Sequence, residues 1–153
     1  MAAAIWVDAD ACPQGVRDML LRAAERTGVS ITFVANQPIR LPKGLSVQAV
    51  QVAAGFDVAD NYIAQRAKPG DLVITQDIPL ASEVVKNGVD AVSPRGDRHT
   101  RESIGQRLAM RDLMSDLRDA GLVRGGPPPM GVADKQRFAN QLDSWLNRRQ
   151  REQ

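Results

Sequence analysis

At 153 residues, with 43% hydrophobic residues, 25% charged residues and a net charge of +2, the chain has the composition of one globular domain. No stretch is apolar enough for a bilayer span, and the first residues lack the basic segment of a signal peptide, so we expect a cytoplasmic protein without membrane association. One cysteine and one histidine exclude an internal disulfide and a typical four-ligand structural zinc site, so any bound metal would need oxygen ligands.

The first half of the sequence predicts three strands and one helix. Residues 3–7 form a short apolar run typical of a buried strand, and apolar residues then recur at helical spacing over 13–27. Gly28 is suited to end that helix. The segment 30–35 predicts a second strand, and the partial alternation in 45–52 predicts a third.

The next segments continue the alternation of helices and strands. A helix is expected over 57–67, starting at Asp57 or Phe56, and the run 71–75 predicts a strong strand. A helix over 78–87 and a short last strand over 89–93 follow. Because strands that alternate with helices form parallel sheets, we predict a three-layer α/β fold with a mainly parallel sheet flanked by helices.

The sequence beyond Pro94 has a different texture. We expect a helix over 101–122, a loop or lid at 125–129, and a last helix capped by Asp134 and followed by a frayed tail, 148–153. The apolar residues expected to face the core from the last helix are Phe138, Leu142, Trp145 and Leu146.

Charge is unevenly distributed between the two parts of the chain. Residues 1–94 carry 8 basic and 10 acidic residues, whereas residues 95–153 carry 12 and 8. The arginine-rich second part is either a solvated helical surface or a phosphate-binding flank, since arginine binds phosphate in a bidentate manner. We expect His99, which lies in this polar part, at the surface, and Cys12 to be a small buried residue rather than a nucleophile.

Aspartates cluster where predicted strands end. Asp8 and Asp10 follow the first strand, Asp77 follows the strong strand, and Asp57 and Asp60 begin the helix between them. The carboxyl ends of parallel strands meet at one edge of the sheet, where ligands of open α/β folds bind. Crowded carboxylates raise one another's pKa values, and a hard cation such as Mg²⁺ or Mn²⁺ relieves the repulsion. Such an ion also activates water for attack on a phosphate.

Each aspartate also has an ordinary structural interpretation. Asp10 and Asp57 are suited to cap helices, and Asp77 to shape a turn. Asp60 lies inside a predicted helix and has no such role. Taken together, the clustering favours a metal site formed by Asp8, Asp10, Asp60 and Asp77.

Further polar residues are candidates for substrate binding at the same edge. Arg95 and Gly96 directly follow the last predicted strand, so Arg95 either holds a substrate phosphate or pairs with an aspartate. Asn36 and Thr75 end two strands and are candidates for neutral hydrogen bonds. Arg111, on the helix that follows, is a candidate for contact with a nucleic-acid backbone.

Several motifs occur in order along nearly the whole chain: VDADACP (7–13), DVAD (57–60), DLVITQDIPLA (71–81) and PRG (94–96). They closely resemble the YaiI/YqxD family of uncharacterised bacterial proteins, which is regarded as PIN-like, akin to nuclease domains that hold divalent metal with acidic residues. The resemblance implies a single PIN-like domain over 1–153, with an α/β core in 1–94 and an arginine-rich helical part in 95–147.

The resemblance also bears on the acidic residues. Asp8, Asp60 and Asp77 fall where PIN-like nucleases place their main acids, and Asp10 is an additional acid. The leading hypothesis is therefore metal-dependent hydrolysis of phosphodiesters, of RNA rather than DNA. With only 4% aromatic residues, base-specific recognition is not indicated.

Two other hypotheses stay open. In a haloacid-dehalogenase-like phosphatase, Asp8 would be the nucleophile, Asp10 the acid/base and Thr75 the second motif. In a non-catalytic module that binds nucleic acid or protein, the acidic site would serve structure alone.

Overall fold

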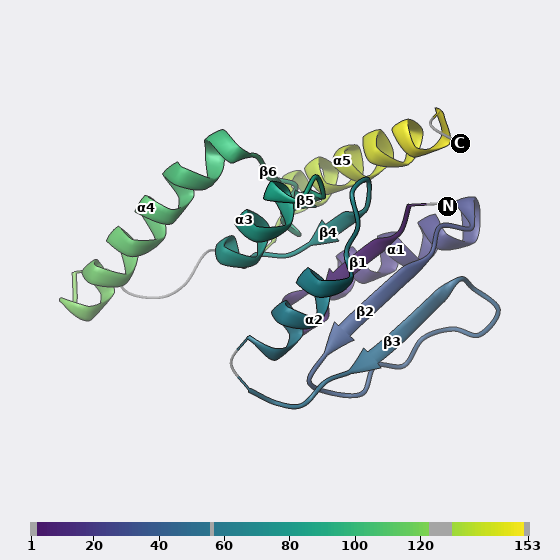
Figure 1. Ribbon diagram of the computed structural model, residues 1–153, viewed down its shortest axis with the longest axis horizontal. Helices are drawn as coiled ribbons and strands as arrows, with labels where there is room; N and C mark the ends of the chain where they lie inside the picture. Colours follow the sequence, from purple (N-terminus) through teal and green to yellow (C-terminus); the bar gives the residue numbers. More distant parts are fainter. Residues whose placement is uncertain (1–2, 56, 123–129, 152–153) are drawn as a thin grey trace.

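A computed structural model describes residues 3–55, 57–122 and 130–151; Phe56, the expected loop at 125–129 and residues 152–153 lie outside this range. The chain forms a six-stranded sheet in the order β3-β2-β1-β4-β5-β6. The strands are β1 (Ile5–Asp8), β2 (Ile31–Ala35), β3 (Val47–Gln51), β4 (Leu72–Ile74), β5 (Asp90–Val92) and β6 (Arg98–His99). The strands from β3 to β5 pair in parallel and β6 pairs antiparallel to β5, which confirms the predicted mainly parallel α/β fold (Figure 1).

The helices are the short 3₁₀ segment η1 (Ala9–Ala11), α1 (Gln14–Thr27), α2 (Val58–Arg66), α3 (Ile78–Lys86), α4 (Arg101–Asp119) and α5 (Val132–Arg151). Helices α1 and α5 share one hydrophobic cluster with the sheet, and α2 and α3 share a second cluster on its other face. The sheet therefore lies between two helical layers, as the three-layer prediction requires.

The central strands are apolar on both faces because helices cover both faces of the sheet. All residues of β2 and of β4 are buried, which is typical of parallel strands. Helix α1 ends at Gly28, whose left-handed φ of 74° closes the last turn, as its sequence predicts.

The order of the strands reverses beside β1. The chain runs from β1 outward to β2 and β3, then returns to the other side of β1 and continues through β4 and β5. The switch point of the sheet therefore lies between the carboxyl ends of β1 and β4, where open α/β folds bind ligands.

Two expectations for the C-terminal part were wrong. Strand β5 is not the last, because β6 pairs with it in antiparallel orientation. Helix α5 begins at Val132, so Asp134 lies in its first turn rather than at the cap, and its carboxylate accepts a hydrogen bond from the Gly131 N–H at 3.1 Å. The helix continues to Arg151, and Arg149 donates to the Ala3 carbonyl at 3.2 Å. The frayed tail expected over 148–153 stays a prediction.

Within the described ranges, no helix is both long and apolar enough to cross a membrane.

Candidate functional site

Thr75 joins the ends of β1 and β4 at the switch point. Its hydroxyl donates to the Asp8 carboxylate at 3.0 Å and accepts the backbone N–H of Asp77 at 3.0 Å. Asp8 is the last residue of β1, and Asp77 begins α3. One buried hydroxyl thus fixes two acidic residues that lie far apart in the sequence.

Asp8, Asp60 and Asp77 are called the acidic group below. Asp77 also has a structural role. It is the N-cap of α3, and its Oδ1 accepts the Leu80 N–H at 2.9 Å. Its carboxylate also shares a side-chain hydrogen bond with Asp60, so the side chains of Asp77 and Asp60 are in direct contact.

Asp60 lies in the first turn of α2 and faces this group. Burial, a side-chain hydrogen bond with Asp77 and the negative charges of Asp77, Asp8 and Asp57 raise the pKa of Asp60 to about 7. Asp57 occupies the N-cap position of α2 with a φ of 64°, but its side chain makes no capping hydrogen bond.

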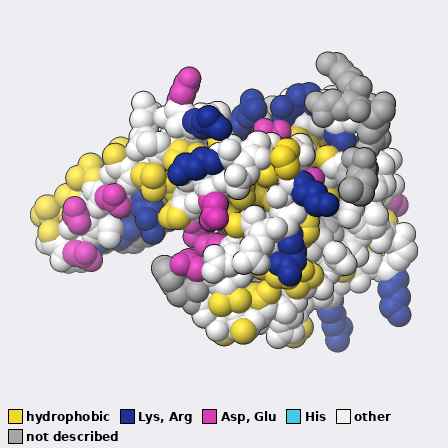
Figure 2. All heavy atoms as spheres, in the orientation of Figure 1, with side chains coloured by type: hydrophobic (Ala, Val, Ile, Leu, Met, Phe, Trp, Pro, Cys, Tyr) yellow, Lys and Arg dark blue, Asp and Glu magenta, His cyan; other side chains and the backbone are white. Residues whose placement is uncertain are grey.

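Asp8 is part of the same electrostatic group. Burial is the largest influence and raises the pKa of Asp8, the hydrogen bond from Thr75 opposes that rise, and the charges of Asp77 and Asp10 add to it. Aspartates from separate segments of the chain therefore influence one another, as expected from the crowding of carboxylates at one edge of the sheet. Figure 2 shows acidic side chains gathered near the starts of α2 and α3.

Asp10 lies at the rim of the group. Its Oδ2 accepts the backbone N–H of Asn36 at 2.9 Å, so it ties the end of β1 to the end of β2. It does not cap α1, whose N-cap is Pro13 without a side-chain hydrogen bond. The Oδ1 of Asn36 is buried and has no hydrogen-bond partner in the described part of the chain.

The carboxylates do not form an enclosed metal site. The described residues contain no group of three or more His, Cys, Asp or Glu side chains placed to hold an ion. Mg²⁺, however, is usually bound through one or two carboxylates, several waters and substrate phosphate oxygens. The Asp60–Asp77 pair, with Asp8 beside it, fits such a partial set of hard oxygen ligands, and a ligand set of all four aspartates stays a prediction.

Arg95 and Gly96 hold α5 against the sheet. The Arg95 guanidinium lies 3.0 Å from the Asp134 carboxylate, which also pairs with Arg137. Of the two roles considered for Arg95, the structure thus shows the pairing with an aspartate. Gly96 has a φ of 90°, and a Cβ there would lie 2.5 Å from the backbone of Arg137.

The expectation of a surface position for His99 was wrong. His99 is only 4% exposed, because β6 carries it against β5. Its Nε2 lies 3.1 Å from the Thr75 carbonyl and its Nδ1 lies 2.7 Å from the Arg107 guanidinium. Since arginine can only donate, Nδ1 accepts, and the proton of the neutral ring lies on Nε2. Burial lowers the pKa of His99, the Thr75 hydrogen bond opposes this, and the charge of Arg107 lowers it further.

A cavity of about 280 Å³ opens beside the acidic edge. Its lining residues are Gln76, Ile78, Ser93, Arg95, Asp97, His99 and Arg107. Gln76 and Ile78 flank Asp77 in the chain, so the cavity adjoins the acidic group. Arg111 is exposed on α4 and is not among the lining residues.

Arg107 was not among the residues singled out from the sequence. In the sequence, Arg107 and Arg111 are both arginines of the same predicted helix, and nothing distinguishes them. The structure distinguishes Arg107 through its contact with the buried His99. Cys12, by contrast, is buried as expected, and burial raises the pKa of its thiol to about 12.

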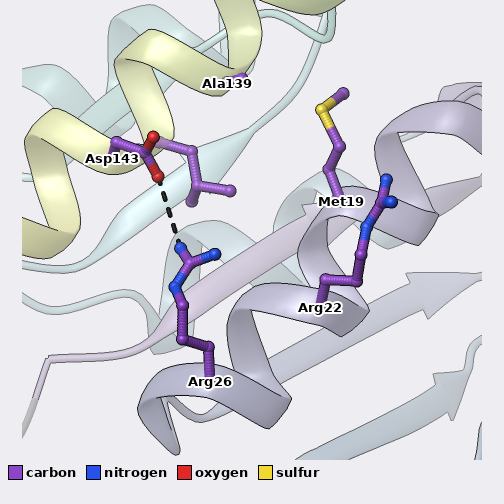
Figure 3. A pocket seen from close by; sticks show the side chains of 6 residues that line it. Met19, Arg22, Arg26, Ala139 and Asp143 are labelled. Atoms are coloured by element: carbon purple, nitrogen blue, oxygen red, sulfur yellow. Dashed lines mark hydrogen bonds and ion pairs between the residues drawn. The ribbon is translucent and has the colours of Figure 1, made fainter.

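A second cavity, of about 160 Å³, lies between α1 and α5. It is lined by Met19, Arg22, Arg26, Ala139, Leu142 and Asp143. Arg26 and Asp143 form an exposed ion pair at 3.4 Å across its mouth (Figure 3). Arg26 is close to the end of α1, which returns the chain to the start of β2, so this cavity lies at the opposite end of the sheet from the acidic group.

The chain matches a family model over residues 6–148, and the family is described as "Uncharacterized BCR, YaiI/YqxD family". It is 59% identical to a UPF0178 protein of Thioalkalivibrio sulfidiphilus over 95% of this chain and 99% of that protein. It is 56% identical to a UPF0178 protein of Psychromonas ingrahamii over 94% and 95% of the two chains, and 54% identical to one of Photobacterium profundum over 93% and 95%. No solved structure matches the chain.

Proposed function

The chain belongs to the YaiI/YqxD family, and from its acidic edge we propose that it is a divalent-metal-dependent phosphodiesterase that cleaves nucleic acid, RNA rather than DNA. The observation that carries this proposal is the electrostatic coupling of Asp8, Asp60 and Asp77 at the switch point of the sheet. The charge of Asp77 raises the pKa of both Asp8 and Asp60, and the charge of Asp8 adds to the rise for Asp60. Negative charge gathered in this way is unfavourable in isolation and becomes favourable when a cation binds.

The side chains around the group have distinct roles in this proposal. Thr75 orients Asp8, and carboxylate oxygens of Asp77 and Asp60, which are in contact with each other, would coordinate the cation. Bound Mg²⁺ or Mn²⁺ would neutralise the carboxylates and activate water toward phosphorus. Asn36 offers a buried oxygen without a partner among the described residues as an acceptor for a substrate hydroxyl.

The preference for RNA and the assignment to the PIN-like superfamily rest on the resemblance of the motifs. The scarcity of aromatic residues, 4% of the chain, favours contact with the phosphate backbone over stacking on bases. Arg95 and Arg111 are the proposed backbone contacts on the C-terminal side, although Arg95 must share its guanidinium with Asp134.

The test is cleavage of labelled single- and double-stranded RNA and DNA by the purified protein with Mg²⁺, Mn²⁺ or EDTA. We expect cleavage of RNA that requires the metal, and its loss in Asp8→Asn and Asp77→Asn. Asp143→Asn is the matched control, because Asp143 is exposed on α5 at the opposite end of the sheet. Activity that survives both acidic-site substitutions would come from a contaminant or from another site.

The same experiment separates the two other hypotheses. A phosphate covalently attached to Asp8, found by mass spectrometry after incubation with a phosphomonoester, would favour the phosphatase. Binding of RNA without cleavage under every metal condition would favour the non-catalytic module.

A further inference from the structure

The cavity beside the acidic edge is lined by positively charged side chains, which the acidic group lacks. Two arginines, Arg95 and Arg107, line it, together with one carboxylate, Asp97, and the neutral ring of His99. Its volume of about 280 Å³ is near the lower end of the range for small-ligand sites, about 300–1,000 Å³, so it has room for a phosphate group and its attached sugar but not for a folded domain.

Arg107 is oriented but not neutralised. Its guanidinium donates to His99 Nδ1 at 2.7 Å, and the partner is an uncharged ring nitrogen. None of the ion pairs found in the described segments includes Arg107. The contrast is with Arg95 in the same cavity, whose guanidinium pairs with Asp134. A half-buried, fixed cation without a carboxylate partner is suited to bind an anion.

His99 links this cation to the acidic edge. Its Nε2–H donates to the Thr75 carbonyl at 3.1 Å, and the Thr75 hydroxyl donates to Asp8 at 3.0 Å. Thr75 therefore holds Asp8 on one side and, through His99, positions Arg107 on the other. A buried histidine whose two nitrogens are both engaged cannot rotate without leaving a polar atom unpaired, so the orientation of Arg107 is fixed before any ligand arrives.

We propose that this cavity binds a phosphate group of the nucleic-acid backbone, with Arg107 as the phosphate-binding residue and His99 as its positioning residue. The identity of the ligand as nucleic acid rests on the proposed function, whereas binding of phosphate does not. The bound phosphate is a neighbour of the one at the acidic edge, because Gln76 and Ile78, which line the cavity, are adjacent in the chain to Asp77. Placing an anion in the cavity then places the next phosphodiester at the carboxylates.

The experiment is an NMR titration of the wild-type protein in EDTA, which observes the Nε–H signals of arginine side chains without any catalysis. The ligands are inorganic phosphate, a 5′-phosphorylated tetraribonucleotide and the same oligonucleotide with a 5′-hydroxyl. We expect the phosphate ion and both oligonucleotides to shift the Arg107 signal, and Arg107→Ala to weaken their binding about tenfold or more. Arg118→Ala, an exposed arginine farther along the same helix, is the control and should bind as the wild type does.

Two further variants separate binding from structure. Arg107→Lys keeps the charge without the guanidinium fork and should lose part of the affinity, while His99→Gln, whose amide can both donate and accept, should retain more affinity than His99→Ala at equal thermal stability. If His99→Ala and His99→Gln bind equally well, His99 does not position Arg107. If the ligands bind without shifting the Arg107 signal, or bind Arg107→Ala as tightly as the wild type, the proposal is overturned.

Outcomes for this site and for the proposed function remain distinguishable. Asp8→Asn should abolish cleavage and leave the titration of the Arg107 signal intact. A protein that binds phosphate through Arg107 but cleaves nothing would support this site and refute the nuclease. A response of Arg107 to inorganic phosphate but to neither oligonucleotide would refute a nucleic-acid ligand and assign the cavity to a free phosphate compound.

Discussion

Helices α4 and α5 have similar lengths and both carry several arginines, yet they relate to the sheet in opposite ways. Helix α5 lies along the sheet, and its residues Phe138, Leu142, Trp145 and Leu146 are all buried. Helix α4 extends away from the sheet, with Ile104 as its one buried residue (Figure 1). Met110 and Leu113 of α4 are 57% and 51% exposed. An amphipathic pattern therefore predicts a helix without predicting whether its apolar face is covered.

The difference lies in how the apolar residues are spaced and where each helix is attached. Those of α5 follow an i, i+4, i+7, i+8 pattern, which gives a wide continuous stripe. Among the described residues, helix α4 packs on α3 and contacts His99 through Arg107, and the Thr100–Ser103 capping box fixes its start. Arg107, which lines the cavity beside the acidic edge, lies in the second turn of α4.

The largest expected effect is the loss of the anchor of α5. Trp145→Ala should lower the free energy of unfolding by about 3–5 kcal/mol, since Trp145 is 3% exposed and its removal leaves a cavity in the main core. Urea denaturation followed by circular dichroism measures this, and Met110→Ala on α4 is the matched control. A Trp145→Ala protein as stable as that control would contradict the packing of α5 on the sheet.

A glycine-to-alanine pair compares the two helices more sharply. Gly96→Ala should cost about 2–4 kcal/mol, because a left-handed φ of 90° disfavours alanine and the new Cβ would lie 2.5 Å from the backbone of Arg137 in α5. In α4, Gly105→Ala meets no atom within 4 Å and should instead stabilise the protein by about 0.5–1 kcal/mol. Thermal and urea unfolding should show changes in the free energy of unfolding of opposite sign for the two variants. Changes of the same sign would contradict the difference between the two positions.

The pH dependence of stability tests the acidic group, which lies outside both α4 and α5. The pKa of Asp60 is raised from 3.8 to about 7 in the folded protein, so between these values the folded state binds more protons than the unfolded state. Without metal, stability should therefore fall as pH rises from about 4 to about 7. Asp60→Asn should flatten this part of the profile, and Mg²⁺ should raise the melting temperature of the wild type at pH 7.5. Because the lowered pKa of His99 acts in the opposite direction, the comparison with Asp60→Asn is decisive: profiles of the two proteins with the same slope through this window would refute the raised pKa of Asp60.

The smallest effect is expected on the free face of α4. Leu113→Ala should change the free energy of unfolding by no more than about 0.5 kcal/mol, because half of the side chain is already exposed. Differential scanning calorimetry is sensitive enough to detect the change. A loss of 2 kcal/mol or more, on the scale of about 2–5 kcal/mol for a buried leucine, would show that something covers this face.

The sequence was informative where a pattern extends over several residues. The apolar runs of β1, β2 and β4 and the Gly28 stop signal predicted the core of the fold and the edge at which Asp8 and Asp77 end up. The placement of the acids followed from topology, because parallel strands end at one edge. Their number and role as metal ligands stay predictions.

Short elements and long-range contacts carried no such signal. Strand β6 has two residues, Arg98 and His99, which is too few to show an alternation. The burial of His99 could therefore not be predicted from the sequence, and neither could the contact of Arg107 with it. The pairing of Arg95 with Asp134 depends on where α5 docks, and local propensity contains no information about that position. Thr75 was a weak candidate because its importance lies in three partners from other segments or turns.

The Thr75 hydroxyl has only one hydrogen, and its neighbours decide where that hydrogen points. Because the oxygen already accepts from the Asp77 N–H, the O–H bond is directed at Oδ2 of Asp8. Oδ2 is therefore kept as an acceptor, and when Asp8 is protonated in acid, the proton goes to Oδ1. The two oxygens of this carboxylate are chemically distinct, with one fixed by the protein and the other left to titrate or to meet a ligand.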